Sequence, residues 1–377
     1  MTMRSNQAGS IRHHTARDLW EARYVGADGR RHSVYATTRK AAQERLRVAL
    51  TGADHGVRPV GQRLTTGAYL DAWLTTSVRI RCRPSTADNY ATIVRAYLAP
   101  ALARVPLAKL GPEHVARMLA DLTARGDLSS TTVRYAYSVL RIALGRALKQ
   151  GKVLRNVCTL VDPPAPARHE ISPLTAEQVG VFLAANADDR LGPLYTVAVG
   201  TGLRQGELLA LRWQDVDLDG PTLAVAHTLT RGTRTLAEPK TERAKRTLRL
   251  GSEVLGALRE QRRRQLAARL AAGSRWRDQG YVFTSGTGAP LDGAFVLRRF
   301  QAALEQARLP RQRFHDLRHA TATLLLESGE ELGVVSKVLG HSNIGTTANV
   351  YAHLTPAMTQ RVADRLDGVL RRPAQAG

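Results

Sequence analysis

The sequence predicts a mainly α-helical protein of several domains that also carries small β-sheets. The chain has 377 residues, which is more than one domain usually holds. Apolar residues recur at helical spacing over residues 63–160, whereas short strand-like patterns occur near the N-terminus and between residues 222 and 250. A proline-rich stretch over residues 161–173 cannot hold a helix and is expected to be an interdomain linker.

Residues 1–58 are predicted to form a small β-β-α module. Trp20, Ala22 and Tyr24 alternate with charged residues, and a turn is expected at Asp28-Gly29. A second strand then runs through Val34, and a helix begins near residue 40. A segment of this size is small for independent stability, so a frayed hairpin is the simpler alternative. A DNA-binding role is favoured by its basic residues, which are Arg23, Arg30, Arg31, Arg39 and Lys40.

Residues 63–160 are predicted to form a helical domain. The expected helices are Thr66–Thr75, Ser85–Leu98, Pro112–Ala124 and Ser129–Lys149. The second of them has a core-facing stripe made of Tyr90, Ile93, Val94 and Tyr97. The loop before it is expected to carry Arg79, Arg81 and Arg83. A charge run of this kind is usually solvated surface.

Basic residues strongly outnumber acidic ones. Lys and Arg number 55 against 32 Asp and Glu, a formal net charge of +23, which favours nucleic acid as the partner. Cys82 and Cys158 are isolated and fit neither a disulfide framework nor a zinc site. No apolar run approaches the roughly 18 residues of a membrane span, and the start lacks the pattern of a signal peptide. We therefore expect a soluble, cytoplasmic, nucleoid-associated protein that contacts no membrane.

Residues 174–377 contain the side chains that can do chemistry. The stretch TGLRQGELLALRW, at 201–213, turns on a glycine and continues as a helix that holds Arg204. Strand-like TLAVAHTLT and KRTLRL follow, joined by a basic, turn-rich stretch. RFHDLRHATATLLLESG, at 313–329, is expected to be a helix with His315 and Arg318 one turn apart on one face. The last stretch, LGHSNIGTTANVYAHL, places His341 ten residues before Tyr351.

The helix that holds His315 carries two histidines at a spacing that metal ligands use. His315 and His319 are four residues apart, as in a zinc-protease motif. Asp316 stands where that motif has Glu, and Arg318 lies between the two histidines. A fixed positive charge there would repel a cation, so we expect no metal.

Two arginines, two histidines, a hairpin lysine and a late tyrosine can together attack a phosphodiester without a metal. The transition state of phosphoryl transfer spreads charge over the non-bridging oxygens. Arg204 and Arg318 each offer a planar fork of donors for that charge. A tyrosine phenol, with an ordinary pKa near 10, is an adequate nucleophile once deprotonated. It also leaves more easily than an alkoxide, so the covalent step can reverse.

These stretches resemble the signature boxes of the tyrosine recombinases, the phage integrase family. The resemblance is strong over residues 172–360. The helical domain is similar to the family's core-type DNA-binding domain, and the N-terminus more loosely resembles an arm-type module. The resemblance implies a catalytic domain of tyrosine-recombinase type over 174–377, with a C-terminal helix and no cofactor. It implies that a 3′-phosphotyrosyl link and a free 5′-hydroxyl form at a phosphate surrounded by Arg204, His315, Arg318 and His341 and attacked by Tyr351.

The resemblance assigns the hairpin lysine to Lys240, in PKTERAKRTLRL. Many relatives have Ser between that lysine and the following Arg, where this chain has Ala244, and Lys245 lies close by. Either lysine can therefore be the general acid. His319 and His353 also occur in relatives beside the active residues, and both are interpreted as structural.

The predicted function is site-specific DNA recombination that integrates or excises a mobile element. We expect double-stranded DNA as the partner, bound at core sites and arm sites by a homotetramer, with accessory directionality and DNA-bending proteins. Chromosome-dimer resolution and topoisomerase-like strand transfer are alternatives, although those relatives commonly lack an arm-type N-terminus. A non-enzymatic DNA-binding regulator would explain the charge but not the catalytic set. The tail has Met358, Val362 and Leu366 at helical spacing, which fits either a helix capping its own domain or one docked on a neighbouring protomer.

Overall fold

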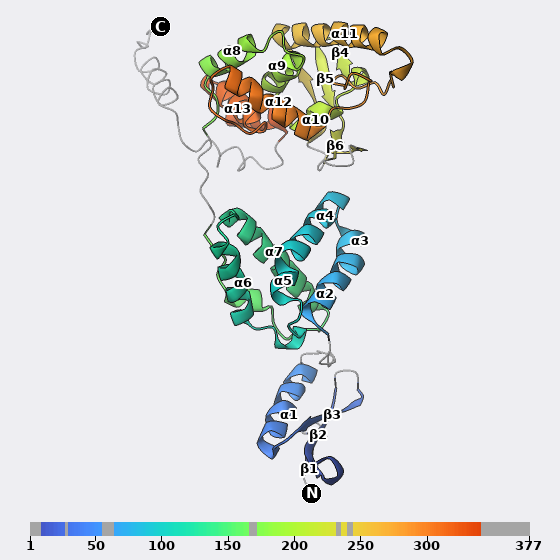
Figure 1. The fold of residues 1–377 in the computed structure, drawn as a ribbon, viewed down its shortest axis with the longest axis vertical. Helices are drawn as coiled ribbons and strands as arrows, with labels where there is room; N and C mark the ends of the chain where they lie inside the picture. Colours follow the sequence, from blue (N-terminus) through green and yellow to red (C-terminus); the bar gives the residue numbers. More distant parts are fainter. Residues whose placement is uncertain are drawn as a thin grey trace, which may run out of the picture. The chain divides into compact units, whose positions relative to one another are not determined.

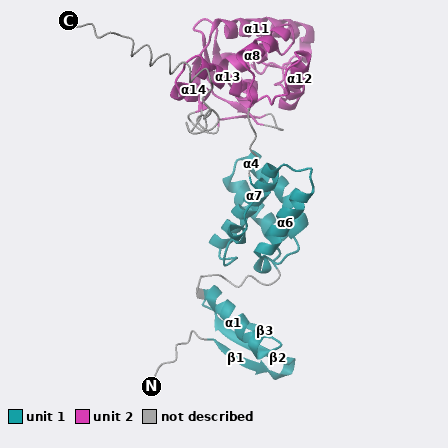
Figure 2. Cartoon of the chain, turned by 90° about the vertical axis from the view of Figure 1, so that its left-hand side faces the viewer, with its two compact units in different colours: residues 1–169 teal, residues 170–377 magenta. Residues whose placement is uncertain are grey.

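The structure is a computed structural model, and it describes residues 9–26, 29–54, 64–165, 172–230, 235–239 and 244–340. The chain divides into two compact units, Met1–His169 and Glu170–Gly377, which Figure 2 shows in different colours. The first unit holds two separate hydrophobic clusters, one in the N-terminal module and one among the helices that follow. No described helix is both long and apolar enough to cross a membrane.

The N-terminal module is a three-stranded antiparallel sheet with one helix (Figure 1). Its elements are β1 (Ser10–His14), β2 (Leu19–Val25), β3 (Arg31–Ala36) and α1 (Arg39–Asp54), with β2 in the centre of the sheet. The two predicted strands and the predicted helix are confirmed, and β1 is an additional strand. Its sequence, SIRHH, has only one apolar residue, so pairing with β2 and not its own hydrophobic pattern makes it a strand.

The two faces of this sheet differ in character. One face packs on α1 through a small core of Ala22, Tyr24, Ala36, Ala42 and Leu46. On the other face the Glu21 side chain is only 2% exposed, between half-exposed Arg12 and Arg23. Its carboxylate accepts hydrogen bonds from Arg12 Nε (2.6 Å), Ser33 Oγ (2.8 Å), Arg23 Nε (3.0 Å) and Tyr35 Oη (3.1 Å). These donors, Arg12 foremost, lower the pKa of Glu21 to about 2.

In the helical part of the first unit, the predicted helices at 112–124 and 129–149 are confirmed to within one residue, and the other two are longer than predicted. Its elements are α2 (Thr66–Trp73), α3 (Arg79–Arg81), α4 (Pro84–Ile93), α5 (Ala99–Leu102), α6 (Pro112–Ala124) and α7 (Ser130–Lys149). Wider π-helical turns at Leu74–Val78 and Val94–Leu98 join α2 to α3 and α4 to α5 without a break.

The prediction of a loop around Arg79 and Arg81 is therefore wrong, because both residues lie on a helix. The predicted helix ends at Thr75, within a run of Thr and Ser residues that have low helix propensity. In the structure the hydroxyls of Thr75 and Thr76 donate to the Ala72 carbonyl one turn back, and the helix continues.

The core of the helical part combines leucines with anchored tyrosines. Leu70, Leu98 and Leu140 are completely buried, and the predicted stripe is confirmed by buried Ile93 and Val94. The hydroxyl of Tyr69 donates to the Ala143 carbonyl at 2.8 Å, and that of Tyr137 donates to the Cys158 carbonyl at 2.6 Å. These bonds satisfy the polar ends of otherwise buried rings.

The second unit mixes helices with short strands. Its helices are α8 (Ala176–Ala185), α9 (Gly192–Thr201), α10 (Gln205–Ala210), α11 (Ser252–Ala272), α12 (Gly293–Gln306), α13 (Asp316–Glu327) and α14 (Leu332–Leu339). Its strands are β4 (Val216–Asp217), β5 (Thr222–Val225), β6 (Thr228–Leu229), β7 (Leu236–Ala237) and β8 (Arg246–Arg249). β4, β5 and β8 form an antiparallel sheet in that order, and β6 pairs with β7. The predicted strands before and after the basic stretch are confirmed.

Helix α9 is the centre of this unit, and its C-terminal end positions the segment that holds Arg204. It packs against α11, α13, α10 and α8, as Figure 1 shows, and its Tyr195 contacts the rings of Phe182 and Phe300 in the core. The helix ends at Thr201 and is capped by Gly202, whose φ of 61° lies in the left-handed region that favours glycine. The chain then turns directly into α10, which begins immediately after Arg204.

Candidate functional site

Arg204 occupies the N-terminal cap of α10 and is held there by Glu207, one turn along the helix. The Arg204 backbone N–H donates to Glu207 Oε2 at 3.1 Å, and Arg204 Nη1 donates to Oε1 at 2.7 Å. The Glu207 side chain is 4% exposed. Burial raises its pKa, but the guanidiniums of Arg246 and Arg204 outweigh that effect and hold the pKa of Glu207 below its usual range. Glu207 therefore stays a carboxylate that orients Arg204.

Arg318 approaches the same place from α13. Its side chain is almost completely buried. Arg318 Nη1 donates to the Gly202 carbonyl at 2.8 Å, and Nη2 donates to the Leu339 carbonyl at 2.6 Å. The guanidinium thus joins the end of α9 to the end of α14.

Arg246, on β8, is a third arginine that reaches Glu207 and the end of α14. Its Nε donates to the Val338 carbonyl at 2.7 Å, Nη1 to the Ala244 carbonyl at 3.0 Å, and Nη2 to Glu207 Oε2 at 3.3 Å. The side chain is only 8% exposed, and this burial lowers the pKa of Arg246. Three different acceptors compensate the buried charge.

Three arginines therefore bind three successive carbonyls at the C-terminal end of α14. Arg246 contacts Val338, Arg318 contacts Leu339, and Arg204 contacts Gly340 at 3.1 Å. The last carbonyls of a helix lack intrahelical partners and form the negative end of its dipole, so cations are favourable there. We call this arrangement the arginine clamp. It fixes the point from which the chain continues to position 341.

His315 lies just before α13, beside His319. The two rings are 5.1 Å apart between centroids and nearly perpendicular. Partial burial, the His319 ring and the guanidiniums of Arg318 and Arg204 lower the pKa of His315 to about 4. The imidazole is neutral near pH 7, so it can donate one hydrogen bond and accept another. Next to it, the carboxylate of buried Asp316 accepts from the backbone N–H of Arg313 and from its guanidinium, at 2.7 and 2.8 Å.

The structure brings three of the six predicted site residues together. Arg204 and Arg318 share the end of α14, and His315 lies within electrostatic reach of both guanidiniums. The other three, Lys240, His341 and Tyr351, lie outside the described residues. So does His353. The alternative lysine, Lys245, is described, and its Nζ lies 3.6 Å from the Glu238 carboxylate.

Two residues of the clamp network were not among the predicted site residues. Glu207 falls three positions after Arg204, the spacing at which a side chain can close a capping box, and this was the signal available for it. Arg246 lies two residues before buried Leu248 on β8, so both side chains are on the same face of the strand. Strand periodicity could therefore have marked Arg246 as facing inward.

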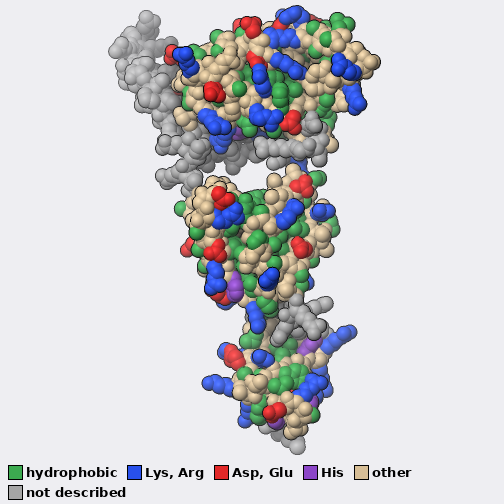
Figure 3. All heavy atoms as spheres, in the orientation of Figure 1, with side chains coloured by type: hydrophobic (Ala, Val, Ile, Leu, Met, Phe, Trp, Pro, Cys, Tyr) green, Lys and Arg blue, Asp and Glu red, His purple; other side chains and the backbone are tan. Residues whose placement is uncertain are grey.

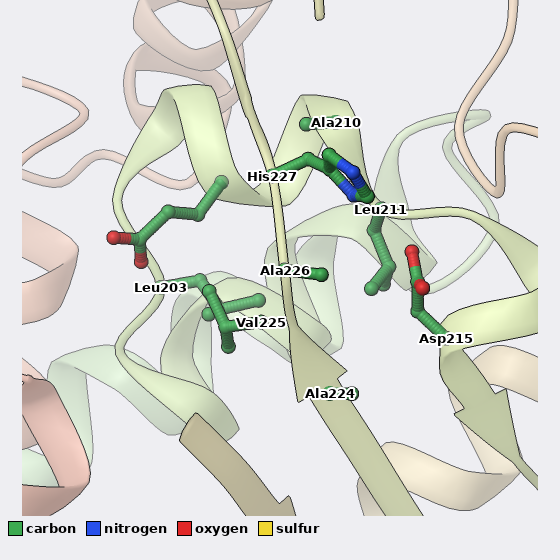
Figure 4. Close-up of a pocket in the computed structure, with 9 residues that line it drawn as sticks. Leu203, Ala210, Leu211, Asp215, Ala224, Val225, Ala226 and His227 are labelled. Atoms are coloured by element: carbon green, nitrogen blue, oxygen red, sulfur yellow. The ribbon is translucent and has the colours of Figure 1, made fainter. Parts of the chain in front are cut away.

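A small hollow lies beside α10 and β5 (Figure 4). Its lining includes Leu203, Ala210, Leu211 and Val225, with Asp215 and His227 as its polar groups beside Glu207. Neither Arg204 nor Arg318 lines it. The hollow is therefore not the candidate phosphate site.

Comparison with known proteins shows which family this chain resembles. Residues 174–358 match the phage integrase family. A XerC-like tyrosine recombinase of Caldanaerobacter subterraneus subsp. tengcongensis is 32% identical over 358 residues, covering 89% of this chain and 91% of the relative. The ICEBs1 integrase of Bacillus subtilis is 26% identical, with 89% of this chain and 91% of the relative covered.

Solved structures share the fold at lower identity. The Tn1549 transposon integrase in complex with a circular intermediate DNA matches with a TM-score of 0.68 at 22% identity, covering 80% of this chain and 99% of that chain. A lambda integrase dimer bound to a core site matches with a TM-score of 0.58 at 19% identity, covering 93% and 96%. From the sequence likeness along most of its length, the chain belongs to the phage integrase family and is a tyrosine-type site-specific recombinase of the kind that integrates and excises mobile elements.

Proposed function

We propose that the protein cuts and rejoins double-stranded DNA through a covalent link between Tyr351 and a 3′-phosphate. The Tyr351 oxygen forms a bond to phosphorus, its proton passes to the solvent, and the bond from phosphorus to the 5′-oxygen breaks. Lys240 gives a proton to that leaving oxygen. A 5′-hydroxyl from a second strand then attacks the same phosphorus and releases the tyrosine, so no external energy source is needed.

The observation that supports this proposal most is the meeting of Arg204 and Arg318 beside position 341. The two guanidiniums come from α10 and α13, and they donate to the adjacent carbonyls of Gly340 and Leu339. A phosphate placed here would meet two positive groups that are already oriented, which is the arrangement that stabilises a phosphoryl-transfer transition state. The neutral ring of His315 and the proposed ligand His341 would complete the set.

Trapping on nicked DNA tests the proposal. A core-site duplex with a nick just past the cleavage position loses its 5′-hydroxyl fragment, so the covalent adduct accumulates. Tyr351→Phe removes one oxygen and should abolish the adduct while the protein still binds the duplex. Tyr195→Phe, which removes a hydroxyl buried in the core of the second unit, is the matched control and should form adduct at the normal rate. An adduct formed by the Tyr351→Phe variant would show that another residue attacks.

The same reasoning assigns different roles to different parts of the chain. We infer a DNA-binding module over residues 1–58, a core-type DNA-binding domain over 63–160, a linker over 161–173 and a catalytic domain over 174–377. Figure 3 shows Lys and Arg side chains across the visible surface of the described parts, consistent with contacts to phosphates in each of them. We also propose that four copies assemble on DNA, with accessory directionality and DNA-bending proteins.

The N-terminal module offers a specific surface for arm sites, the open face of its sheet. Glu21 holds the Nε atoms of Arg12 and Arg23, whose side chains remain 54% and 47% exposed. Arginines fixed in this way can bind phosphates or guanine edges with little loss of side-chain entropy.

Arg12→Ala combined with Arg23→Ala tests this surface. The double variant should bind arm-site DNA more weakly, with a shallower dependence on salt, and should cleave core-site DNA at the normal rate. Arm-site binding that is unchanged in affinity and in salt dependence would contradict this assignment.

A further inference from the structure

Arg246 is bound in a way that points to a role in the reaction even though its own guanidinium is enclosed. Its side chain is 8% exposed, and its three donor atoms go to Val338, Ala244 and Glu207. Burying a guanidinium is costly unless the geometry of its partners is good, and a well-packed apolar residue often serves stability as well. Stability alone therefore does not account for an arginine here.

The partners of Arg246 connect it to Arg204 through a single carboxylate. Glu207 Oε1 accepts from Arg204 Nη1 at 2.7 Å, while Oε2 accepts from the Arg204 backbone N–H at 3.1 Å and from Arg246 Nη2 at 3.3 Å. Arg246 thus limits the rotation of the carboxylate that orients Arg204. Its other end binds the Val338 carbonyl, two residues before the Gly340 carbonyl that Arg204 binds.

The packing around Gly340 shows how closely Arg246 follows the end of α14. Gly340 has a φ of 66°, and a Cβ atom there would lie 2.8 Å from Arg246 Nη1. The arginine therefore lies against the backbone at the residue that precedes position 341. Movement of the Arg246 side chain would free both the Glu207 carboxylate and the last turn of α14.

We propose that Arg246 is a positioning residue for DNA cleavage, which acts by holding Glu207, and through it Arg204, against the end of α14. The inference rests on the proposed role of Arg204 as a ligand of the scissile phosphate. Arg246 itself does not touch the phosphate. Lysine cannot replace it fully, because one ammonium on a flexible stem cannot reach three separated acceptors that a planar guanidinium reaches together.

The test measures single-turnover cleavage of nicked core-site DNA by the full-length protein in excess. The variants are Arg246→Ala, Arg246→Lys, Arg204→Ala and the Arg204→Ala/Arg246→Ala double variant. Arg249→Ala removes an exposed charge from the same strand and is the matched control, which should keep the normal rate. Each protein is used with an ordinary scissile phosphate and with a methylphosphonate, in which a methyl group replaces one non-bridging oxygen and removes the charge.

If Arg246 acts through Arg204, Arg246→Ala should slow cleavage of ordinary DNA by roughly 10- to 100-fold, the usual effect of removing a group that orients a site residue. The loss should shrink strongly on the neutral methylphosphonate, as it should for Arg204→Ala, because the charge to be stabilised is absent. The double variant should be no slower than Arg204→Ala alone, since the two changes remove one interaction. Arg246→Lys should recover part of the rate.

Other outcomes would overturn the inference. Equal slowing of Arg246→Ala on both substrates would mean that the residue only supports the fold. If that variant fails to fold by circular dichroism, Arg246→Lys carries the same comparison between substrates. A normal rate for Arg246→Ala beside a slow Arg204→Ala would refute the role of Arg246 and leave the proposed site intact. A normal rate for Arg204→Ala would refute the proposed site itself.

Discussion

Arg204 donates from Nη2 to the carbonyl of Gly340 at 3.1 Å, so the N-terminal cap of α10 is bound to the residue that precedes position 341. These residues are 136 positions apart in the sequence. The bond joins the first signature stretch to the last one. It gives Arg204 a defined direction before any DNA is bound.

This contact predicts that Arg204→Lys will damage catalysis more than binding. Lysine keeps the charge but cannot donate to Glu207 and Gly340 at once while facing a phosphate. We expect cleavage to slow by about 10²- to 10³-fold, the cost of losing one oriented donor at a developing charge. Single-turnover cleavage and gel-shift affinity on core-site DNA measure the two effects. Arg249→Lys serves as control, and a variant that loses affinity but keeps its rate would contradict the prediction.

The lowered pKa of His315 predicts an unusual titration. The native ring resists protonation down to about pH 4, whereas the unfolded ring takes up a proton below its ordinary pKa of 6.5. The contribution of His315 to stability is therefore full above pH 6.5 and is lost as the pH falls from 6.5 towards 4. Histidine-detected NMR of the DNA-free protein should show a midpoint near 4, with His315→Gln identifying the signal. A midpoint at or above 6.5 would contradict the described environment.

The choice between Lys240 and Lys245 can be made by changing the leaving group. Sulfur in place of the bridging 5′-oxygen leaves as a thiolate, which needs no proton, since a thiol has a pKa of about 8.5. Loss of a general acid typically costs roughly 10²- to 10⁴-fold in rate. Lys240→Ala should therefore be slow on ordinary DNA and largely recover on the sulfur substrate.

Two controls complete this experiment. Arg204→Ala should stay slow on both substrates, because it loses charge stabilisation and not a proton. Lys245→Ala should be rescued little, since its Nζ lies 3.6 Å from Glu238 and we assign it no proton transfer. Rescue of Lys245→Ala with Lys240→Ala left slow would show that the general acid is the other lysine.

Gly202 is predicted to be intolerant of a side chain. Its φ is +61°, and a Cβ atom would lie 2.5 Å from Leu339 Cδ2. A non-glycine residue in the left-handed region costs about 1–3 kcal/mol, so Gly202→Ala should lower the free energy of unfolding by at least that order. Gly180→Ala is the control: the glycine lies within α8 with no atom within 4 Å of its Cβ position, and alanine should stabilise by about 0.5–1 kcal/mol. Urea unfolding that shows equal stability for both variants would contradict the packing.

The signature residues could be predicted from the sequence because they lie in local stretches with fixed spacing. His315 and Arg318 were predicted on one helix, and the structure begins that helix at Asp316, one residue after His315. Arg204 needed only the turn and helix around it. Pro112 correctly marked the start of α6, and the apolar stripe from Tyr90 to Tyr97 correctly predicted a helix, which the structure continues to Leu102.

Long-range contacts could not be predicted in the same way. Arg246 and Val338 are 92 positions apart, and nothing in either stretch indicates that the guanidinium and the carbonyl form a hydrogen bond. Strand β1 depends on its pairing with β2, and the helix after Trp73 continues because it buries Val78 in the core of the helical part. In each case tertiary or side-chain contacts override the local propensity.

The covalent intermediate itself gives the most direct test of the proposed chemistry. The protein is trapped on nicked core-site DNA and digested with trypsin and nuclease, and the linked peptide is sequenced by mass spectrometry. We predict a nucleotide attached through its 3′-phosphate to the oxygen of Tyr351, with a free 5′-hydroxyl on the other product. A nucleotide on any other residue, or a link through a 5′-phosphate, would contradict the account.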